Sequence, residues 1–261
     1  DLVRSRGLGD VYKRQEPGFG RARRGGCTGD DPRYVRNWWE QSSALSKHLC
    51  RWIPFAKGGA YSRFYSDIDL VVFWDTERQT FPGFEGRKGR ETSRPEALDA
   101  YFKPGLTWPR RTQRGFNLRI LPEGCIFADK GPAIFTKNDE DTWYLLGLAN
   151  SAPAEYLLKG LMSFGSWEVG VIKRLPVPEP SPAQRECIGT LARQIHDAKA
   201  VWDTGNETST RFTRPGLLRE DLALLDLPSR LDDLAEQEAS EESHIQALYA
   251  ELNDAAYKLY D

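Results

Sequence analysis

The spacing of apolar residues changes abruptly near residue 138, and this change limits the folds open to the chain. Before it, apolar side chains either alternate with polar ones, as in residues 116–121, or form short unbroken runs, as in residues 70–74. Both patterns are typical of strands. After it, apolar residues recur at every third or fourth position, which is typical of amphipathic helices. The sequence therefore predicts an α+β fold in which a β region precedes a helical region.

The first half of the chain is predicted to contain short strands separated by turns. These strands cover residues 52–55, 68–74, 116–121, 125–127 and 133–135, and we expect them to form a small, mostly antiparallel β region. Residues 21–29, rich in glycine and arginine, and the aperiodic residues 76–95 are predicted to be loops. The apolar spacing after Asp30 predicts a helix that continues to Ser42.

The second half is predicted to be mainly helical, with a polar loop at residues 205–216. Residues 143–149 and 156–162 form an αα-hairpin around Asn150-Ser151. A long amphipathic helix is predicted to begin after Ser181, because Pro182 and Gln184 complete a capping box with Pro at the first helical position. From Leu217 to the last residue the chain is predicted to be helical and acidic, with a break at Pro228.

Composition excludes several classes of protein. The chain has 261 residues, of which 39% are hydrophobic, and this is enough to bury a core. Its longest unbroken apolar run, residues 70–74, is far shorter than the roughly 20 residues of a membrane helix. The cysteines form no Cys-x-x-Cys pair and the histidines have no metal-ligand spacing. We therefore expect a reduced, cytoplasmic protein without zinc and without a membrane partner.

Charge is distributed unevenly along the sequence. The net charge is −2, yet residues 1–125 carry a net charge of +8 and the remainder carries −10. The first half is therefore suited to face a polyanion, and the second half would be repelled by one.

Residues 1–15 are predicted to be foreign to the protein. Asp10-Val11-Tyr12-Lys13-Arg14-Gln15 matches a translation of a transposase end sequence that is used to prepare sequencing libraries. We expect an assembly artefact here, and a native chain that is a fragment of a longer protein.

A cluster of cations and aromatic side chains is the strongest candidate for a binding site. Guanidinium groups bind phosphates or pair with guanine, and aromatic rings stack on bases. The candidate DNA-binding residues are Lys57, Arg63, Lys103, Trp108, Arg110, Arg111, Arg114 and Arg119. The irregular residues 109–114 favour base reading by Arg111 and Arg114, and the alternating strand favours a phosphate contact by Arg119. A solvated basic face is the alternative interpretation.

A second pattern suggests different chemistry. Gly58-Gly59 followed by Asp67 and Asp69 resembles the turn and Asp-x-Asp strand of metal-dependent nucleotidyltransferases. The expected Gly-Ser and a third carboxylate are missing, so carboxylates at the edge of a buried strand are the simpler interpretation. His48 and Cys50 have no partner base or acid for nucleophilic catalysis. We predict no catalytic residue in this chain.

Several separated strings resemble one family. Thr28-Gly29-Asp30-Asp31 and Trp38-Trp39-Glu40 resemble the opening of the target-recognition region in BREX-type (PglX-like) adenine-specific DNA methyltransferases, with Asp31 where the family has Asn. Strings similar to the family follow in the same order at residues 52–61, 101–108, 121–135 and 252–260. Those at residues 145–156 and 172–178 resemble a wider class of DNA-specificity domains, which includes type I specificity subunits and restriction-modification enzymes that fuse methylation to cleavage. The clearest departure is residues 109–114, where the family has a Ser-rich stretch.

The resemblance implies a function for the parent protein. Such an enzyme transfers a methyl group from S-adenosylmethionine to adenine in double-stranded DNA, in phage defence or restriction-modification. Its Asn-Pro-Pro-Tyr and cofactor glycines match no position here, so the fragment is expected to be inactive and to bind no cofactor. We expect a target-recognition domain at residues 16–203 and a helical extension at residues 204–261. The expected partners are DNA, an upstream methyltransferase domain and other defence proteins. A non-catalytic specificity subunit is the alternative.

Overall fold

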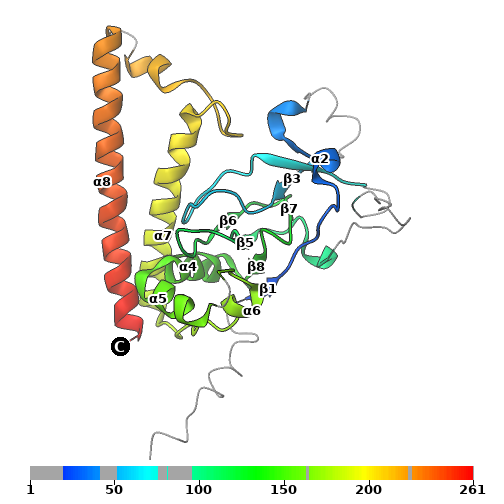
Figure 1. The fold of residues 1–261 in the computed structure, drawn as a ribbon. Coiled ribbons are helices and arrows are strands. Elements are labelled where there is room, and N and C mark those ends of the chain that lie inside the picture. The colour runs from blue at the N-terminus through cyan, green and yellow to red at the C-terminus, as the bar shows by residue number, and fades with distance from the viewer. Residues whose placement is uncertain are drawn as a thin grey trace, which may run out of the picture.

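The computed structural model describes residues 20–41, 52–75, 81, 96–162, 165–222 and 225–260. Two small, mostly antiparallel β-sheets lie beside a set of helices, in which α7 and α8 run next to each other (Figure 1). The predicted α+β class is confirmed. The predicted artefact at residues 1–15, His48, Cys50 and most of the predicted loop at residues 76–95 lie outside the described residues.

The first sheet is built from strands far apart in the sequence. Its order is β1 (Arg21–Arg23), β8 (Ala133–Phe135), β5 (Gly105–Thr107) and β6 (Arg119–Leu121), and all its pairs are antiparallel. The strand predicted at residues 133–135 is confirmed, and the one predicted at residues 116–121 is confirmed only for residues 119–121. The loop predicted at residues 21–29 is wrong at its start, because β1 pairs with β8, more than a hundred residues along the chain. Local composition carries no signal of such a pairing.

The second sheet has one parallel pair. Its order is β2 (Val35–Asn37), β4 (Leu70–Phe73), β3 (Trp52–Ala56) and β7 (Ile126–Phe127), with β3 and β7 parallel. The strands predicted at residues 52–55, 68–74 and 125–127 are confirmed. The helix predicted after Asp30 is wrong, because it stops after the single turn α2 (Asp31–Tyr34), and β2 and the 3-10 turn η1 (Trp38–Glu40) follow. Pairing of β2 with β4 outweighs the helical spacing of its apolar residues.

The central helices agree with the predictions. After the 3-10 turn η2 (Leu98–Ala100) and the strands, α4 (Asp139–Asn150) and α5 (Ala152–Leu161) form the predicted αα-hairpin. The short helix α6 (Val169–Ile172) leads to α7 (Pro182–Trp202). The capping box of α7 is confirmed, because Ser181 Oγ accepts a hydrogen bond from the Gln184 amide at 3.3 Å and the Gln184 side chain accepts one from the Ser181 amide at 2.9 Å.

The C-terminal segment is dominated by one long helix. Three 3-10 turns, η3 (Asp203–Gly205), η4 (Gly216–Leu218) and η5 (Glu220–Leu222), precede α8 (Leu227–Tyr260). The break predicted at Pro228 is wrong. Pro228 lies in the first turn of α8, where the missing N–H has no helical partner to lose.

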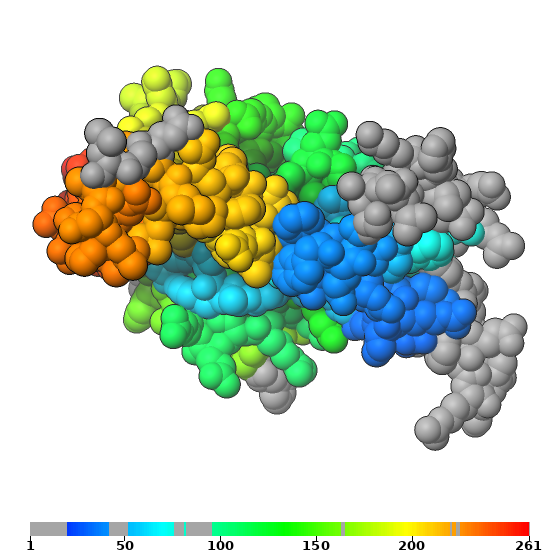
Figure 2. Space-filling model, turned by 90° about the horizontal axis from the view of Figure 1, so that it is seen from above, coloured from blue at the N-terminus to red at the C-terminus, as the bar shows by residue number. Residues whose placement is uncertain are grey.

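The segment between α7 and η4 is attached to the N-terminal part of the chain. The Trp38 indole donates to the Thr208 carbonyl at 2.9 Å. Figure 2 shows the two regions, coloured yellow to orange and blue, in contact on one face of the molecule.

Two apolar cores hold the sheets in place. The larger core lies between the first sheet and helices α4, α5, α7 and α8, and includes Leu106, Trp108, Leu118, Leu146 and Leu252. The smaller core lies in the second sheet and includes Phe55, Val72, Trp74, Phe81 and Phe127. Each fully buried large side chain contributes roughly 1.5–3 kcal/mol by removal from water. Within the part of the chain that the structure describes, no helix is long and apolar enough to cross a membrane.

Candidate nucleic-acid interface

Residues 109–115 form a loop whose base is fixed to the protein core. We call it the recognition loop. Trp108, just before it, is fully buried, and its indole N–H donates to the Trp167 carbonyl at 2.8 Å. The Arg110 amide donates to the Lys130 carbonyl at 2.9 Å, and the Trp167 amide donates to the Arg110 carbonyl at 2.7 Å. The loop therefore leaves β5 from a rigid base.

The far end of the recognition loop is a tight turn. The Thr112 hydroxyl lies 3.3 Å from the Gly115 carbonyl and accepts a hydrogen bond from the Arg114 amide at 3.1 Å. Gly115 has a φ of +123°, and a Cβ at this position would lie 2.3 Å from a carboxylate oxygen of Glu155. This value of φ favours glycine, and a larger side chain would also require Glu155 to shift.

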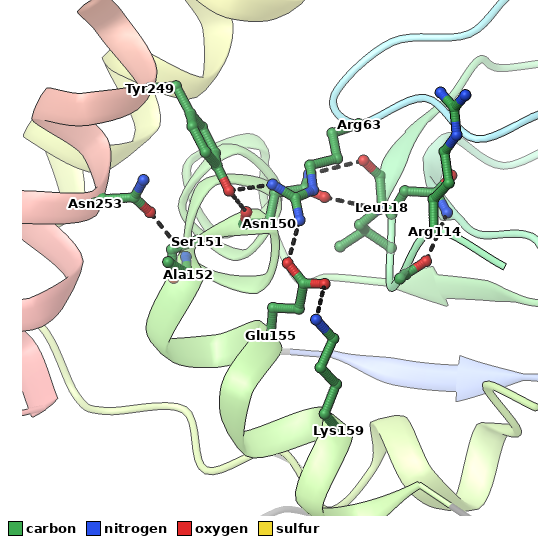
Figure 3. A network of polar contacts seen from close by, with 12 residues as sticks. Arg63, Arg114, Leu118, Asn150, Ser151, Ala152, Glu155, Lys159, Tyr249 and Asn253 are labelled. Carbon is green, nitrogen blue, oxygen red and sulfur yellow. Dashed lines mark hydrogen bonds and ion pairs between the residues drawn. The ribbon is translucent and has the colours of Figure 1, made fainter. Parts of the chain in front are cut away.

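The recognition loop exposes two arginines and an amide. Arg111, Gln113 and Arg114 are exposed, and Figure 3 shows the Arg114 side chain pointing away from Glu155. Arg110 is turned back toward the protein, where its guanidinium lies 3.5 Å from carboxylate oxygens of both Asp129 and Glu168. The structure thus brings Arg111 and Arg114 together as exposed cations, and assigns Arg110 to holding the loop.

Two of the predicted DNA-binding residues are buried, which corrects their predicted contact with DNA. Trp108 is 0% exposed and Arg119 is 2% exposed. The alternating pattern predicted that Arg119 faces solvent. Instead, the segment after β3 lies along β6, Phe64 forms a bridge with Arg119, and the Arg119 guanidinium donates to the Gly58 carbonyl at 2.9 Å. Burial lowers the pKa of this guanidinium to about 10.

Lys57 and Arg63 are engaged by carboxylates within the protein. The Lys57 ammonium forms an ion pair with Asp31, and the Arg63 guanidinium forms one with Glu155. Both side chains are largely buried. In this conformation both cations have a structural role within the protein, and their contact with DNA stays a prediction.

Arg63 lies at the centre of a polar network that joins several elements (Figure 3). It donates to the Tyr249 hydroxyl from α8 and to Glu155 from α5, and Glu155 also pairs with Lys159 at 2.9 Å. The Tyr249 hydroxyl donates to the Asn150 carbonyl at 2.8 Å. The buried Asn150 side chain in turn bonds both the amide and the carbonyl of Leu118, at 2.9 and 2.8 Å. The network therefore fixes the helices relative to the segment that carries the recognition loop.

Lys103 is exposed but lies apart from the recognition loop. It precedes β5, whereas the loop follows β5, so the strand separates them. The structure does not bring Lys103 next to Arg111 and Arg114.

The Asp-x-Asp pattern has a structural use. The Asp67 carboxylate accepts hydrogen bonds from the Ser209 hydroxyl at 3.0 Å, and from the Thr210 amide and hydroxyl, both at 2.6 Å. Asp69 is exposed, and its carbonyl accepts from the Trp38 amide at 2.8 Å. Among the described residues there is no group of three or more His, Cys, Asp or Glu side chains able to hold a metal ion. Asp67 holds the segment after α7 in place.

Sequence reasoning missed two residues near the loop. Gln113 is exposed between the two arginines, and Lys130 is exposed on the turn whose carbonyl receives the Arg110 amide. A cation in the Lys-Gly-Pro turn was the available signal for Lys130, since turns lie on the surface.

The fold is similar to part of one solved restriction-modification enzyme. It matches part of MmeI, a type IIL restriction-modification enzyme whose structure was determined in complex with DNA, with a TM-score of 0.55 and 14% sequence identity. The match covers 93% of this chain and 33% of the MmeI chain.

Two proteins of known class are similar in sequence. Over 192 residues the chain is 27% identical to the adenine-specific methyltransferase BrxX of Escherichia coli O9:H4 (strain HS), covering 71% of this chain and 15% of BrxX. Over 208 residues it is 27% identical to the adenine-specific methyltransferase PglX of Lacticaseibacillus casei (strain Zhang), covering 76% and 17% respectively. No protein-family profile matches the chain. The predicted resemblance to PglX-like methyltransferases is confirmed, for a segment that spans 15–17% of these relatives.

Proposed function

We propose that this chain is the DNA target-recognition part of an S-adenosylmethionine-dependent, adenine-specific DNA methyltransferase. The observation that carries the proposal is the recognition loop, whose base is fixed and whose Arg111 and Arg114 are exposed. The relatives are adenine-specific methyltransferases, and the protein of similar fold was solved with DNA. Residues 16–203 form the recognition domain and residues 204–261 its helical extension, and an upstream methyltransferase domain is the partner in the parent chain.

The chemistry of the loop suits duplex DNA. A guanidinium pairs bidentately with O6 and N7 of guanine, an amide such as Gln113 pairs with N6 and N7 of adenine, and either arginine can bind a phosphate. A fixed base restricts the loop before binding, so less conformational entropy is lost in the complex.

The chain's own residues do not fit S-adenosylmethionine. Paired glycines follow two of the described strands after one intervening residue, Gly25-Gly26 after β1 and Gly58-Gly59 after β3. Gly25-Gly26 lead to α2, which is a single turn of four residues, and Gly58-Gly59 lead into an extended segment, so neither forms the glycine turn that opens a long helix. The sequence contains no Asn-Pro-Pro-Tyr. We therefore assign cofactor binding and methyl transfer to the remainder of the parent enzyme, and only DNA contact to this chain.

The test measures DNA binding as a function of salt. Arg111→Ala and Arg114→Ala are compared with wild type on short duplexes by fluorescence anisotropy. Loss of a phosphate contact lowers affinity for every sequence and reduces the salt slope by about one unit, whereas loss of a guanine contact costs roughly 1–3 kcal/mol on the target only.

A matched control separates loop contacts from general charge. Arg193 is exposed on α7 and pairs with Asp139 at 2.8 Å, so Arg193→Ala removes the same charge away from the recognition loop. We expect it to bind DNA as wild type does. Binding that is unchanged by both loop substitutions would contradict the proposal.

A further inference from the structure

A hollow of about 370 Å³ lies on the surface beside the recognition loop. It is bounded by residues 26–32 on one side and by Asp129 and Lys130 on the other, with Phe55 and Pro32 as apolar lining. This volume falls within the range of roughly 300–1,000 Å³ that is usual for small-molecule sites.

One wall of the hollow is fixed by a satisfied ion pair. The Asp31 carboxylate accepts a hydrogen bond from the Thr28 hydroxyl at 2.7 Å and pairs with the Lys57 ammonium. Burial raises the pKa of Asp31, but the hydrogen bonds from Lys57 and Thr28 outweigh it, and the pKa lies below its usual value. Lys57 thus explains why a carboxylate stands where the related family has Asn. These groups are used by the fold and are unavailable to a ligand.

Two further charged groups line the hollow, and the positive charge of one of them, Lys130, also helps to lower the pKa of Asp31. Within the part of the chain that the structure describes, neither the Asp30 carboxylate nor the Lys130 ammonium has a hydrogen-bond or ion-pair partner. The hollow therefore offers one anionic acceptor and one cationic donor. A complementary ligand carries an N–H donor and an anionic group on a flat, partly apolar body.

The hollow and the recognition loop share a backbone framework. The Lys130 carbonyl accepts the Arg110 amide at 2.9 Å, and the Asp129 amide donates to the Gly26 carbonyl at 2.9 Å. A strand of DNA that contacts Arg111 therefore passes close to Lys130.

We propose that the hollow holds one unpaired nucleotide of the bound DNA, with an exocyclic amine of its base at Asp30 and its phosphate at Lys130. This inference rests on the proposed function. Adenine, cytosine and guanine carry such an amine, and thymine does not. The base ring lies against the exposed Pro32, because Phe55, although it lines the hollow, is only 1% exposed. A base that has left the stack exposes the edge that Asp30 reads.

The experiment uses three short duplexes that differ at one position: fully paired, with a single bulged dC, and with a single bulged dT. We expect the wild-type chain to bind the bulged-dC duplex about tenfold more tightly than the bulged-dT duplex, which corresponds to ~1.4 kcal/mol. Asp30→Ala abolishes this preference and leaves binding to bulged dT unchanged. Lys130→Ala weakens binding to both bulged duplexes severalfold.

Controls keep the outcomes distinct. Asp254 is exposed on α8, so Asp254→Ala removes the same charge elsewhere and retains the preference. If Asp30→Ala lowers the melting temperature of the protein, the Lys130→Ala variant is used for the test instead, because Lys130 is exposed. Equal binding of the dC and dT bulges by wild type overturns the inference, while the proposed function stands as long as the paired duplex binds through Arg111 and Arg114. If the chain binds none of the three duplexes, both the proposed function and this inference are contradicted.

Discussion

Arg119 is a cation that the fold keeps out of solvent, and its burial has an energetic consequence. The depressed pKa shows that the surroundings disfavour the charged form, and a neutral apolar side chain of similar size avoids that cost. We expect Arg119→Met to change the free energy of unfolding by less than about 1 kcal/mol, and Arg119→Ala, which leaves a cavity, to lower it by roughly 2–4 kcal/mol. Urea unfolding measures both.

The same pair of variants tests the structural role assigned to Arg119. Because Arg119 is 2% exposed, neither substitution should alter the salt slope of DNA binding in the folded protein. A slope reduced by about one unit in Arg119→Met would instead indicate a phosphate contact.

The lowered pKa of Lys199 predicts that the stability of the protein depends on pH. Its ammonium on α7 donates to the Ser62 hydroxyl and to the Arg63 carbonyl, both at 2.8 Å. Burial, with smaller contributions from Arg119 and Arg63, lowers its pKa from 10.5 to about 8. Between these two values the folded protein binds fewer protons than the unfolded chain at this site, so the contribution of Lys199 to stability rises with pH.

The measurement is urea unfolding from pH 7 to 9.5, before tyrosine ionisation in the unfolded chain dominates. We expect the free energy of unfolding of Lys199→Met to rise less with pH than that of wild type. Lys258→Met changes an exposed lysine on α8 and should follow wild type. Parallel curves for wild type and Lys199→Met would contradict the prediction.

At the scale of elements, α8 is held by its C-terminal half. Leu248, Leu252 and Ala256 are its buried residues, and Leu252 is 0% exposed, whereas Leu231 near the other end is 51% exposed. We expect Leu252→Ala to cost roughly 2–5 kcal/mol and Leu231→Ala less than about 0.5 kcal/mol. Thermal unfolding followed by circular dichroism compares the two, and similar losses would show that α8 packs along its whole length.

For the whole molecule, the elements predicted correctly are those with local signals. The Ser181 capping box starts α7, and Asn150-Ser151 divide α4 from α5. The elements predicted wrongly depend on distant partners: β1 pairs with β8, and β2 pairs with β4. Short strands gain most of their stability from such pairing, and a single sequence does not reveal which segments meet.

In the candidate site, too, the features with local signals were predicted correctly and those that depend on distant partners were not. Exposure of Arg111 and Arg114 agrees with the irregular sequence around them, since irregular loops run over the surface. Burial of Lys57, Arg63 and Arg119 depends on the segment after β3 folding back along β6, and on carboxylates supplied by other elements. The number of cations can be read from the sequence, but the sequence does not show which of them are buried or paired with carboxylates in the folded protein.

We proposed that methyl transfer belongs to another part of the parent enzyme, and this leads to a prediction about the activity of the chain. The exposed groups of the recognition loop can bind DNA, but the chain has no Asn-Pro-Pro-Tyr, and the one glycine turn that joins a described strand to a helix leads only to the four-residue α2. Methyl transfer to an adenine amine needs both a bound methyl donor and groups that hold the extruded base next to it. We therefore expect purified residues 16–261, given S-adenosylmethionine with a labelled methyl group and duplex DNA, to transfer no label above a heat-treated sample. An active adenine methyltransferase in the same buffer is the positive control. Label incorporated into DNA by the chain alone would place catalytic groups within these residues, and would contradict the assignment of this segment to recognition.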